Sequence, residues 1–599
     1  MLRNFFMGNE FRAYKIFGAH PKVKNKKAGV EFCVYAPNAK AVSLIGEFNG
    51  WTPQTMHNNE GIYTLFVSNA SKGMMYKYRV YHDDGTFCDK ADPYGFAMEL
   101  RPGGASIVTD LSGYRFSDSE WIKNRDKSYN KPVNIYELHA GSWIRPDEGR
   151  FTSYRELTKK LIKYLKENNF THIEFMPLLE HPLDASWGYQ VTGFFAVTSR
   201  YGEAKDFMYL VNQCHKAGIG VIMDFVPVHF AVDEYGLGKF DGTPLYEYPD
   251  KRMYTQWGSY AFNFERPEVC SFLCSSVNFW IETYHIDGIR MDAVSNILYY
   301  NGDTSMWNSG GVEFIKKLNS GIEKRHPDIM MIAEDSSSYL KVTAPVEYDG
   351  LGFDYKWDMG WMNDTINFFK TPPIERKYHS GKIMFSMYYF YSELFMLPIS
   401  HDENVHGKAT ILNKMWGDYD VKFEQILTFY TYMFAHPGKK LNFMGNEFGH
   451  FREWDENKEC DWMLLDYEKH RRLNEYFKGL GRLYTTNPAM HDCEYNSNAF
   501  SWLTTDIERD CICVIERKNA AGSVIIVMNF DNRAVKNYTF GTDRYMKLKK
   551  VMDSNMALYS DIPCDDEIIE SRHEGYSGKP YRISTDIAAF ASKIYIEIK

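Results

Sequence analysis

The chain has 599 residues, which at roughly 150 residues per domain predicts several compact units, or fewer if one of them is a barrel of about 250 residues. Its net charge of −9 argues against a nucleic-acid or anionic-membrane partner, because both favour a basic surface. The four lysines within residues 22–27 are interpreted as a solvated loop rather than a basic tail. The composition therefore indicates an ordinary globular protein.

The ten cysteines show neither paired CxxC motifs nor the Cys/His spacing of a metal site. The pairs Cys270/Cys274 and Cys511/Cys513 are interpreted as small buried hydrophobic residues. The sequence has no basic segment followed by a short apolar one at its start, and no run of 18 apolar residues. We therefore expect a cytoplasmic protein with reduced thiols.

The chain divides by pattern into five segments. Residues 1–24 are assigned to an N-terminal extension, and residues 25–112, with short alternating strands between turns, predict a β-sandwich. Residues 113–130 are polar and are interpreted as a linker. Residues 131–485 alternate short apolar strands with amphipathic helices, and residues 486–599 return to a β pattern and predict a C-terminal all-β domain.

The segment 131–485 predicts a (β/α)8 barrel, because eight buried strands are separated by helices. Ser153 and Glu156 form a capping box before one helix, and Pro267 suits the first turn of another. The eight strands are expected to begin near Ile135, Ile173, Val221, Ile286, Met330, Phe353, Phe395 and Leu441.

Polar residues interrupt the ends of four of these strands, where the active site of such a barrel lies. The four stations run from Asp224 to His229, from Arg290 to Asp292, from Glu334 to Asp335, and from His401 to Glu403. A single strand-end acid is more often a helix cap or a turn residue. Four such stations in one barrel predict a catalytic site.

Arg290 and Asp292 are two residues apart, so both point to one face of their strand. A neighbouring guanidinium keeps a carboxylate ionised, as a nucleophile requires. Glu334, on the next strand, is then the expected proton donor. Glycosidic bond cleavage needs this pair of carboxyl groups, and a gap of about 5–5.5 Å between them gives retention of configuration. The alternative is a buried Arg–Asp bridge that only supports the barrel.

The four stations resemble the four conserved regions of glycoside hydrolase family 13, the α-amylase superfamily. The resemblance implies that Asp292 is the nucleophile and Glu334 the general acid/base. It implies that Asp402 is the third carboxylate, which grips sugar hydroxyls. It also implies that further side chains line the glucose unit at the cleaved bond, namely Asp224, His229, Arg290 and His401.

Other stretches resemble the 1,4-α-glucan branching enzymes of this superfamily. They are Tyr136–Trp143, Trp187–Gln190, Gly352–Trp361, Ser400–Lys408 and Phe443–His450. Tyr189 matches a donor-site tyrosine of that group, and residues 25–112, with their Gly46–Trp51 turn, look like its glycogen-binding module. The resemblance implies transfer of a glucan segment to a 6-hydroxyl, with formation of an α-1,6 branch. It implies an enzyme of the hexosyltransferase type.

The sequence departs from the family pattern at Asp335, Asn404, Trp416 and Phe451–Trp454, none of which is a predicted carboxylate. A metal site built from His229, Asp233, Glu234 and Asp241 is possible on paper, but this spacing fits no ligand pattern. We therefore expect no metal and no cofactor, an α-glucan polymer as substrate and a monomeric enzyme. The alternatives are a hydrolase or debranching enzyme of the same superfamily, or a glucan-binding protein without catalysis.

Overall fold

The fold is that of a computed structural model, which describes residues 1–146 and 149–598. The chain forms two compact units, each built from several segments. Unit 1 consists of Met1–Asp126, His139–Ile162 and Glu174–Asp354. Unit 2 consists of Lys127–Leu138, Lys163–Ile173 and Tyr355–Lys599.

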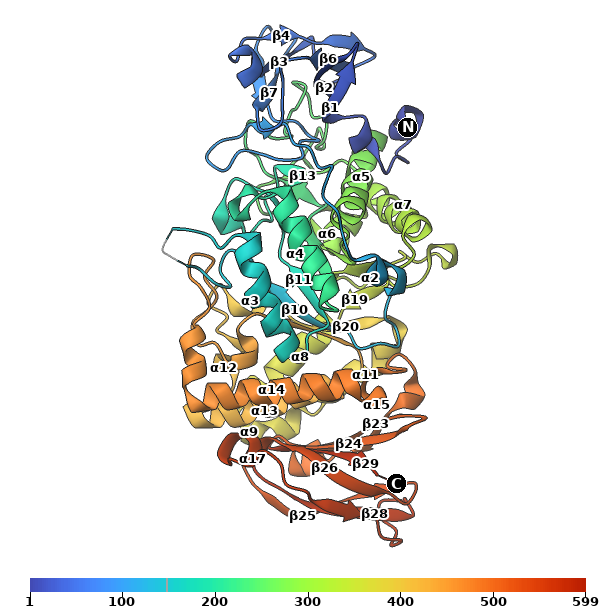
Figure 1. The fold of residues 1–599 in the computed structure, drawn as a ribbon. Coiled ribbons are helices and arrows are strands. Elements are labelled where there is room, and N and C mark those ends of the chain that lie inside the picture. The colour runs from blue at the N-terminus through green and yellow to red at the C-terminus, as the bar shows by residue number, and fades with distance from the viewer. Residues whose placement is uncertain (147–148, 599) are drawn as a thin grey trace. The chain divides into compact units, whose positions relative to one another are not determined.

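Eight strands close into a barrel in the order β10-β11-β14-β17-β18-β19-β20-β21, and their registered neighbours run parallel. Each strand begins within two residues of its predicted start, so the predicted (β/α)8 barrel is confirmed (Figure 1). The strands could be recognised in the sequence because nearly all their residues are buried and most are apolar. Parallel strands covered on both faces must be buried in this way. Their bounds are β10 Asn134–Leu138, β11 His172–Phe175, β14 Gly220–Phe225, β17 Gly288–Met291, β18 Met330–Ala333, β19 Tyr355–Trp357, β20 Phe395–Ile399 and β21 Lys439–Phe443.

Local signals set the ends of the barrel helices. Helix α3, Tyr154–Glu167, follows a reciprocal capping box: Glu156 Oε2 accepts from Ser153 N at 2.9 Å, and Ser153 Oγ accepts from Glu156 N at 3.2 Å. Helix α5, Pro267–Tyr284, begins on the predicted proline, whose missing N–H costs nothing at a first turn.

Two antiparallel sheets form the N-terminal module, shown in blue in Figure 1. One contains β1 (Gly18–Lys24) and β2 (Lys27–Tyr35), and the other contains β3 (Ala41–Gly46) and β7 (Met75–Tyr81). Phe32 on β2 packs against Tyr76 on β7 with ring centroids 4.9 Å apart, so the core lies between the sheets. Strand β1 corrects two predictions, since residues 18–24 belong to this fold and the lysine-rich segment is a hairpin, although its side chains are exposed.

Residues 113–130, predicted as a linker, include helix α2 (Ser119–Asn124), and residues 113–126 are part of unit 1. Asp118 lies 2.9 Å from His215 Nδ1 and 2.9 Å from His285 Nδ1. Trp121 Nε1 donates to Asp287 Oδ1 at 2.8 Å. The polar composition that suggested a linker reflects partners that lie about 90 to 170 residues away along the chain.

The C-terminal domain in unit 2 contains a six-stranded sheet, β22-β23-β24-β29-β26-β27, and a two-stranded sheet, β25-β28. Its first strand, β22, starts at Phe500, because helices α14 (Glu468–Thr486) and α15 (Pro488–His491) precede it. Strands β24 (Gly522–Asn529) and β29 (Ser592–Glu597) pair antiparallel, and their apolar side chains help to fill the core. The predicted all-β character is thus confirmed.

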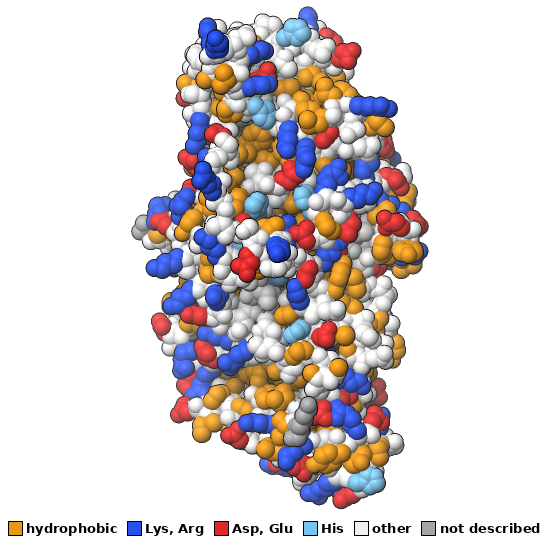
Figure 2. Space-filling model, turned by 45° about the vertical axis from the view of Figure 1, so that its right-hand side comes forward, with side chains coloured by type: hydrophobic (Ala, Val, Ile, Leu, Met, Phe, Trp, Pro, Cys, Tyr) orange, Lys and Arg blue, Asp and Glu red, His pale blue; other side chains and the backbone are white. Residues whose placement is uncertain are grey.

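The charged side chains are spread over the visible surface. On the face drawn in Figure 2, lysines and arginines alternate with aspartates and glutamates rather than forming one basic area. Among the described residues, no helix combines the length and the apolar character that crossing a membrane requires.

Candidate active site

Arg290 on β17 organises a cluster of carboxyl groups in unit 1. Its Nη1 donates to Asp224 Oδ2 at 2.6 Å and to Asp292 Oδ1 at 2.8 Å, while Nη2 lies 3.1 Å from Glu334 Oε2. The strand register explains the meeting, because Asp224 on β14 is directly paired with Arg290. Sequence reasoning predicted the Arg290–Asp292 pair, and the structure adds two further carboxylates to the same guanidinium.

The four side chains differ in their access to solvent. Arg290 is 1% exposed and Asp224 is 2% exposed, whereas Asp292 and Glu334 are 13% and 18% exposed. Burial by itself lowers the pKa of Arg290, but the surrounding carboxylates, Asp224 first among them, hold that pKa well above its ordinary value. The guanidinium is therefore a permanent cation that fixes two carboxyl groups while leaving them open to a ligand.

The backbone after β17 also positions Glu334. Ala293 adopts a left-handed conformation with φ 48° and ψ 47°, and its N–H donates to Glu334 Oε2 at 2.7 Å. The Asp292 N–H donates to the Phe225 carbonyl at 3.0 Å, which continues the barrel ladder up to the proposed nucleophile. Both carboxyl groups thus stand on rigid strand ends rather than on loops.

Tyr189 and His229 are the other predicted site residues in unit 1. The Tyr189 hydroxyl donates to Asp224 Oδ2 at 2.7 Å, so the predicted donor-site tyrosine joins the network around Arg290. His229 is buried, its ring centroid lies 5.1 Å from that of Trp257, and burial lowers its pKa to about 4. The imidazole is therefore neutral near pH 7 and can donate or accept a hydrogen bond with a sugar hydroxyl.

Unit 2 carries a separate group of predicted site residues around His401. Its Nδ1 lies 2.6 Å from Glu137 Oε1, its backbone N–H donates to Glu137 Oε2 at 2.9 Å, and its Nε2 lies 3.5 Å from Asp402 Oδ1. His401 is buried, whereas the Asp402 side chain is 44% exposed. Asp402 is thus the open member of this group, and Glu137 fixes the orientation of the imidazole.

Sequence reasoning missed Glu137. It lies in the fully buried strand β10, where an acidic side chain needs a partner. An acid next to the end of an otherwise apolar strand was the criterion applied to four other strands, and the same criterion would have found it.

Two of the departures from the family pattern also meet in unit 2. The Asn404 side chain donates to the Ser400 carbonyl at 3.1 Å, and the Trp454 N–H donates to the Asn404 carbonyl at 2.9 Å. The Trp454 ring lies edge-on to His401 with centroids 6.2 Å apart. These departures therefore support the loop that carries His401 and Asp402.

The residues weighed as a metal site do not converge. Asp241 accepts from the Asn38 backbone N–H at 2.9 Å and from the Thr243 hydroxyl at 2.7 Å, so its carboxylate joins the module to the barrel loop. Within the part of the chain that the structure describes, no group of three His, Cys, Asp or Glu side chains is arranged to hold a metal ion.

Comparison with known families and proteins agrees with this geometry. Residues 16–95 match carbohydrate-binding module 48, the isoamylase N-terminal domain, and residues 142–241 and 248–522 match the alpha amylase catalytic domain. The catalytic module of the glycogen-degrading pneumococcal virulence factor SpuA covers 100% of this chain and 98% of its own, with a TM-score of 0.74 at 16% identity. That likeness concerns the fold alone.

Curated relatives narrow the class further. The 1,4-alpha-glucan branching enzyme GlgB of Bacillus caldolyticus is 46% identical over 98% of this chain and 90% of its own. Those of Geobacillus stearothermophilus and Halothermothrix orenii are 43% and 44% identical over 99% and 98% of this chain and 95% and 97% of their own.

A parallel barrel with carboxyl groups at its strand ends, preceded by a module 48 domain, defines an α-amylase-type protein of glycoside hydrolase family 13. Within that class the chain belongs to the family of GlgB 1,4-α-glucan branching enzymes.

Proposed function

We propose that this protein is a 1,4-α-glucan branching enzyme that cleaves an α-1,4 bond of a linear glucan and transfers the released segment to a 6-hydroxyl. One observation carries the proposal: a single buried guanidinium holds Asp292 and Glu334, and both carboxyl groups remain open to a ligand. The family membership supports the choice of branching within the superfamily.

In the first half-reaction the Asp292 carboxylate attacks the anomeric carbon. The α-1,4 bond breaks as the Glu334 carboxylic acid gives its proton to the departing oxygen. The segment is then an ester of Asp292, and Glu334 is a carboxylate. Arg290 donates to Asp292 and so favours its ionised form, which is the form that attacks.

In the second half-reaction Glu334 removes the proton from a glucan 6-hydroxyl, whose oxygen attacks the same anomeric carbon. The bond to Asp292 breaks and an α-1,6 bond forms with net retention. Water competes at this step. A well-oriented acceptor reaches an effective molarity on the order of 10⁵–10⁸ M, so acceptor positioning decides between transfer and hydrolysis.

The remaining predicted residues take supporting roles in this proposal. Asp402, open to solvent beside His401, would grip hydroxyls of the reacting glucose. Tyr189, Asp224 and His229 would contact the reacting glucose as well. The module of residues 16–95 would hold the polymer, and the enzyme would act as a cytoplasmic monomer without cofactor.

The decisive experiment follows amylose during incubation with the purified protein. Branching removes the iodine colour of amylose while the number of reducing ends stays constant, and it creates α-1,6 links. A parallel rise in reducing ends without new α-1,6 links identifies a hydrolase and refutes the proposal. Full colour and an unchanged product would identify a binding protein.

A further inference from the structure

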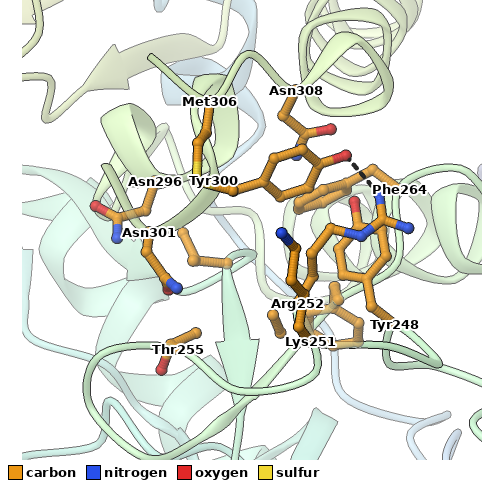
Figure 3. A pocket seen from close by; sticks show the side chains of 13 residues that line it. Tyr248, Lys251, Arg252, Thr255, Phe264, Asn296, Tyr300, Asn301, Met306 and Asn308 are labelled. Carbon is orange, nitrogen blue, oxygen red and sulfur yellow. Dashed lines mark hydrogen bonds between the residues drawn. The ribbon is translucent and has the colours of Figure 1, made fainter. Parts of the chain in front are cut away.

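A cavity lies in unit 1, and the residues of the carboxylate cluster are not among those that line it. Its volume is about 220 Å³, several times the roughly 30 Å³ of one water in the liquid, which is room for one sugar ring. It lies between the loop that follows β14 and the segment that follows β17. Figure 3 shows Asn296 and Asn301 on one side of it and Tyr248 and Arg252 on the other.

Arg252 forms a rigid wall of this cavity, which we name the Arg252 pocket. Its guanidinium lies 4.3 Å from the Tyr248 ring centroid and 5.1 Å from that of Tyr300. It also donates to Asp250 at 2.7 Å, to Glu265 at 2.6 Å and to the Tyr300 hydroxyl at 2.8 Å. Two stacked rings and three hydrogen bonds hold one orientation, so the wall is formed before any ligand arrives.

The charge balance at this wall favours a neutral ligand over an anion. Lys251 and Arg252 carry two positive charges, and Asp250 and Glu265 carry two negative ones beside them. An anion would have to compete with carboxylates that already occupy the guanidinium. Asn296 and Asn301 add neutral amide side chains to the lining, and an amide can form hydrogen bonds with a hydroxyl.

The pocket adjoins the catalytic cluster through two short stretches of chain. Val228, which lines it, precedes His229, and Asn296 lies four residues after Asp292. Trp257 stands at this side of the pocket, because its backbone N–H donates to Oγ1 of the lining residue Thr255 at 3.3 Å while its ring packs on His229. Trp257 is 46% exposed, so its ring is accessible to a sugar chain.

A second exposed tryptophan is next in the chain to two residues that line the pocket. Trp307 lies between the lining residues Met306 and Asn308 and is 49% exposed. Its ring is nearly parallel to that of Tyr339, with an interplanar angle of 12° and centroids 5.9 Å apart. A tryptophan supported in this way keeps one flat face in place, and a pyranose can stack on it at little entropic cost.

We propose that the Arg252 pocket binds one glucosyl ring of the α-glucan, away from the bond that is cleaved, with Trp257 and Trp307 as stacking platforms beside it. The inference rests on the proposed glucan substrate and adds a binding site to it. A chain held there is anchored at a set number of rings from Asp292, so the pocket helps to select the length of the glucan that reacts.

The test uses two variants of the active, full-length enzyme, one that fills the pocket and one that removes a stacking residue beside it. Met306→Trp places a large ring in the cavity, and Trp307→Ala removes one platform. We expect each variant to raise the KM for amylose roughly tenfold, the loss of about one stacked ring, and to leave kcat nearly unchanged. Chromatography of debranched products is expected to show a shifted distribution of branch lengths.

Met463→Trp is the matched control, because it adds the same side chain at a position that is 64% exposed and does not line the cavity. It is expected to keep the parental KM. Thermal unfolding checks each variant, and if Met306→Trp is poorly folded, the exposed Trp307→Ala decides. Unchanged KM and branch lengths in folded variants overturn the proposal.

Inorganic phosphate is the probe for the anionic alternative. Competition between phosphate and amylose in the parent, lost in Met306→Trp, would assign an anion site and also overturn the inference. Failure of the proposed function is distinguishable from either result, because the parent enzyme would then leave the iodine colour of amylose unchanged or raise the number of reducing ends without new α-1,6 links.

Discussion

Two buried charge clusters of opposite composition have different roles in this protein: one belongs to the candidate active site and the other supports the fold. In unit 1 one cation, Arg290, faces three carboxylates, two of which remain partly exposed. In unit 2 one carboxylate, Glu494, faces three cations at 2.8, 4.0 and 3.9 Å, and all four side chains are 0% exposed. The three cations are Lys439, Lys440 and Arg517.

The cluster around Glu494, which we name the closed cluster, pairs its charged groups with one another and with backbone carbonyls. Lys439 also donates to two backbone carbonyls, and Arg517 donates to two more. Burial raises the pKa of Glu494, but Lys439, Lys440 and Arg517 together lower it, and the net pKa is below the ordinary value. The comparison teaches that a buried charge cluster marks a reactive site only where some of its members keep a path to solvent.

The substitution Asp292→Asn is the strongest test of the idea that the cluster around Arg290 is the reactive one. The change removes the proposed nucleophile but keeps the size of the side chain, so we expect branching to fall by roughly 10³-fold or more with little change in thermal stability. Asp561→Asn, at a fully exposed surface position, is the control and should branch amylose normally. Residual activity close to the parental rate in Asp292→Asn would reassign the nucleophile.

Glu494→Gln tests the closed cluster. The substitution leaves three buried cations without their carboxylate, which costs about 3–5 kcal/mol of unfolding free energy for such a buried group. The specific activity of the folded fraction should stay the same. Glu475→Gln removes an exposed carboxylate that pairs with Lys478, and it should cost less than about 1 kcal/mol. Denaturant unfolding followed by fluorescence measures both, and equal losses would contradict the comparison.

A third buried charge cluster, around His215, extends the comparison, and the pH dependence of stability tests it. His215 lies between Asp118 and Asp287, and although burial lowers its pKa, these carboxylates raise the pKa to about 9. Because the pKa of His215 is higher in the folded protein than in the unfolded chain, protonation of His215 stabilises the fold. This stabilisation, roughly 3 kcal/mol, is complete below the unfolded pKa of about 6.5 and is lost as the pH rises through 9.

The difference between the parent and His215→Gln isolates this contribution. Thermal unfolding from pH 6 to pH 10 should show the parent losing more stability than the variant in the window between about pH 6.5 and pH 9. Parallel curves for the two proteins would show that His215 is not protonated in the fold.

The sequence by itself determined the barrel and most of the carboxylate cluster around Arg290. Buried parallel strands are apolar on both faces, so they stand out from their helices, and a polar residue such as Asp224 or Arg290 at a strand end is conspicuous. Helix starts were equally local, as the Ser153–Glu156 box and Pro267 illustrate. These features depend on neighbours within a few residues.

The tertiary structure alone decided which distant groups meet. His401 and Glu137 are 264 residues apart, and His215 and Asp118 are 97 apart. The Lys22–Lys27 hairpin and the docked segment of residues 113–130 were misread for the same reason, since composition does not reveal a partner strand or a buried histidine. The pattern of residues along the chain encodes which positions are buried and which secondary structure they form. The energy of a buried charged group depends instead on neighbouring groups that only the fold brings together.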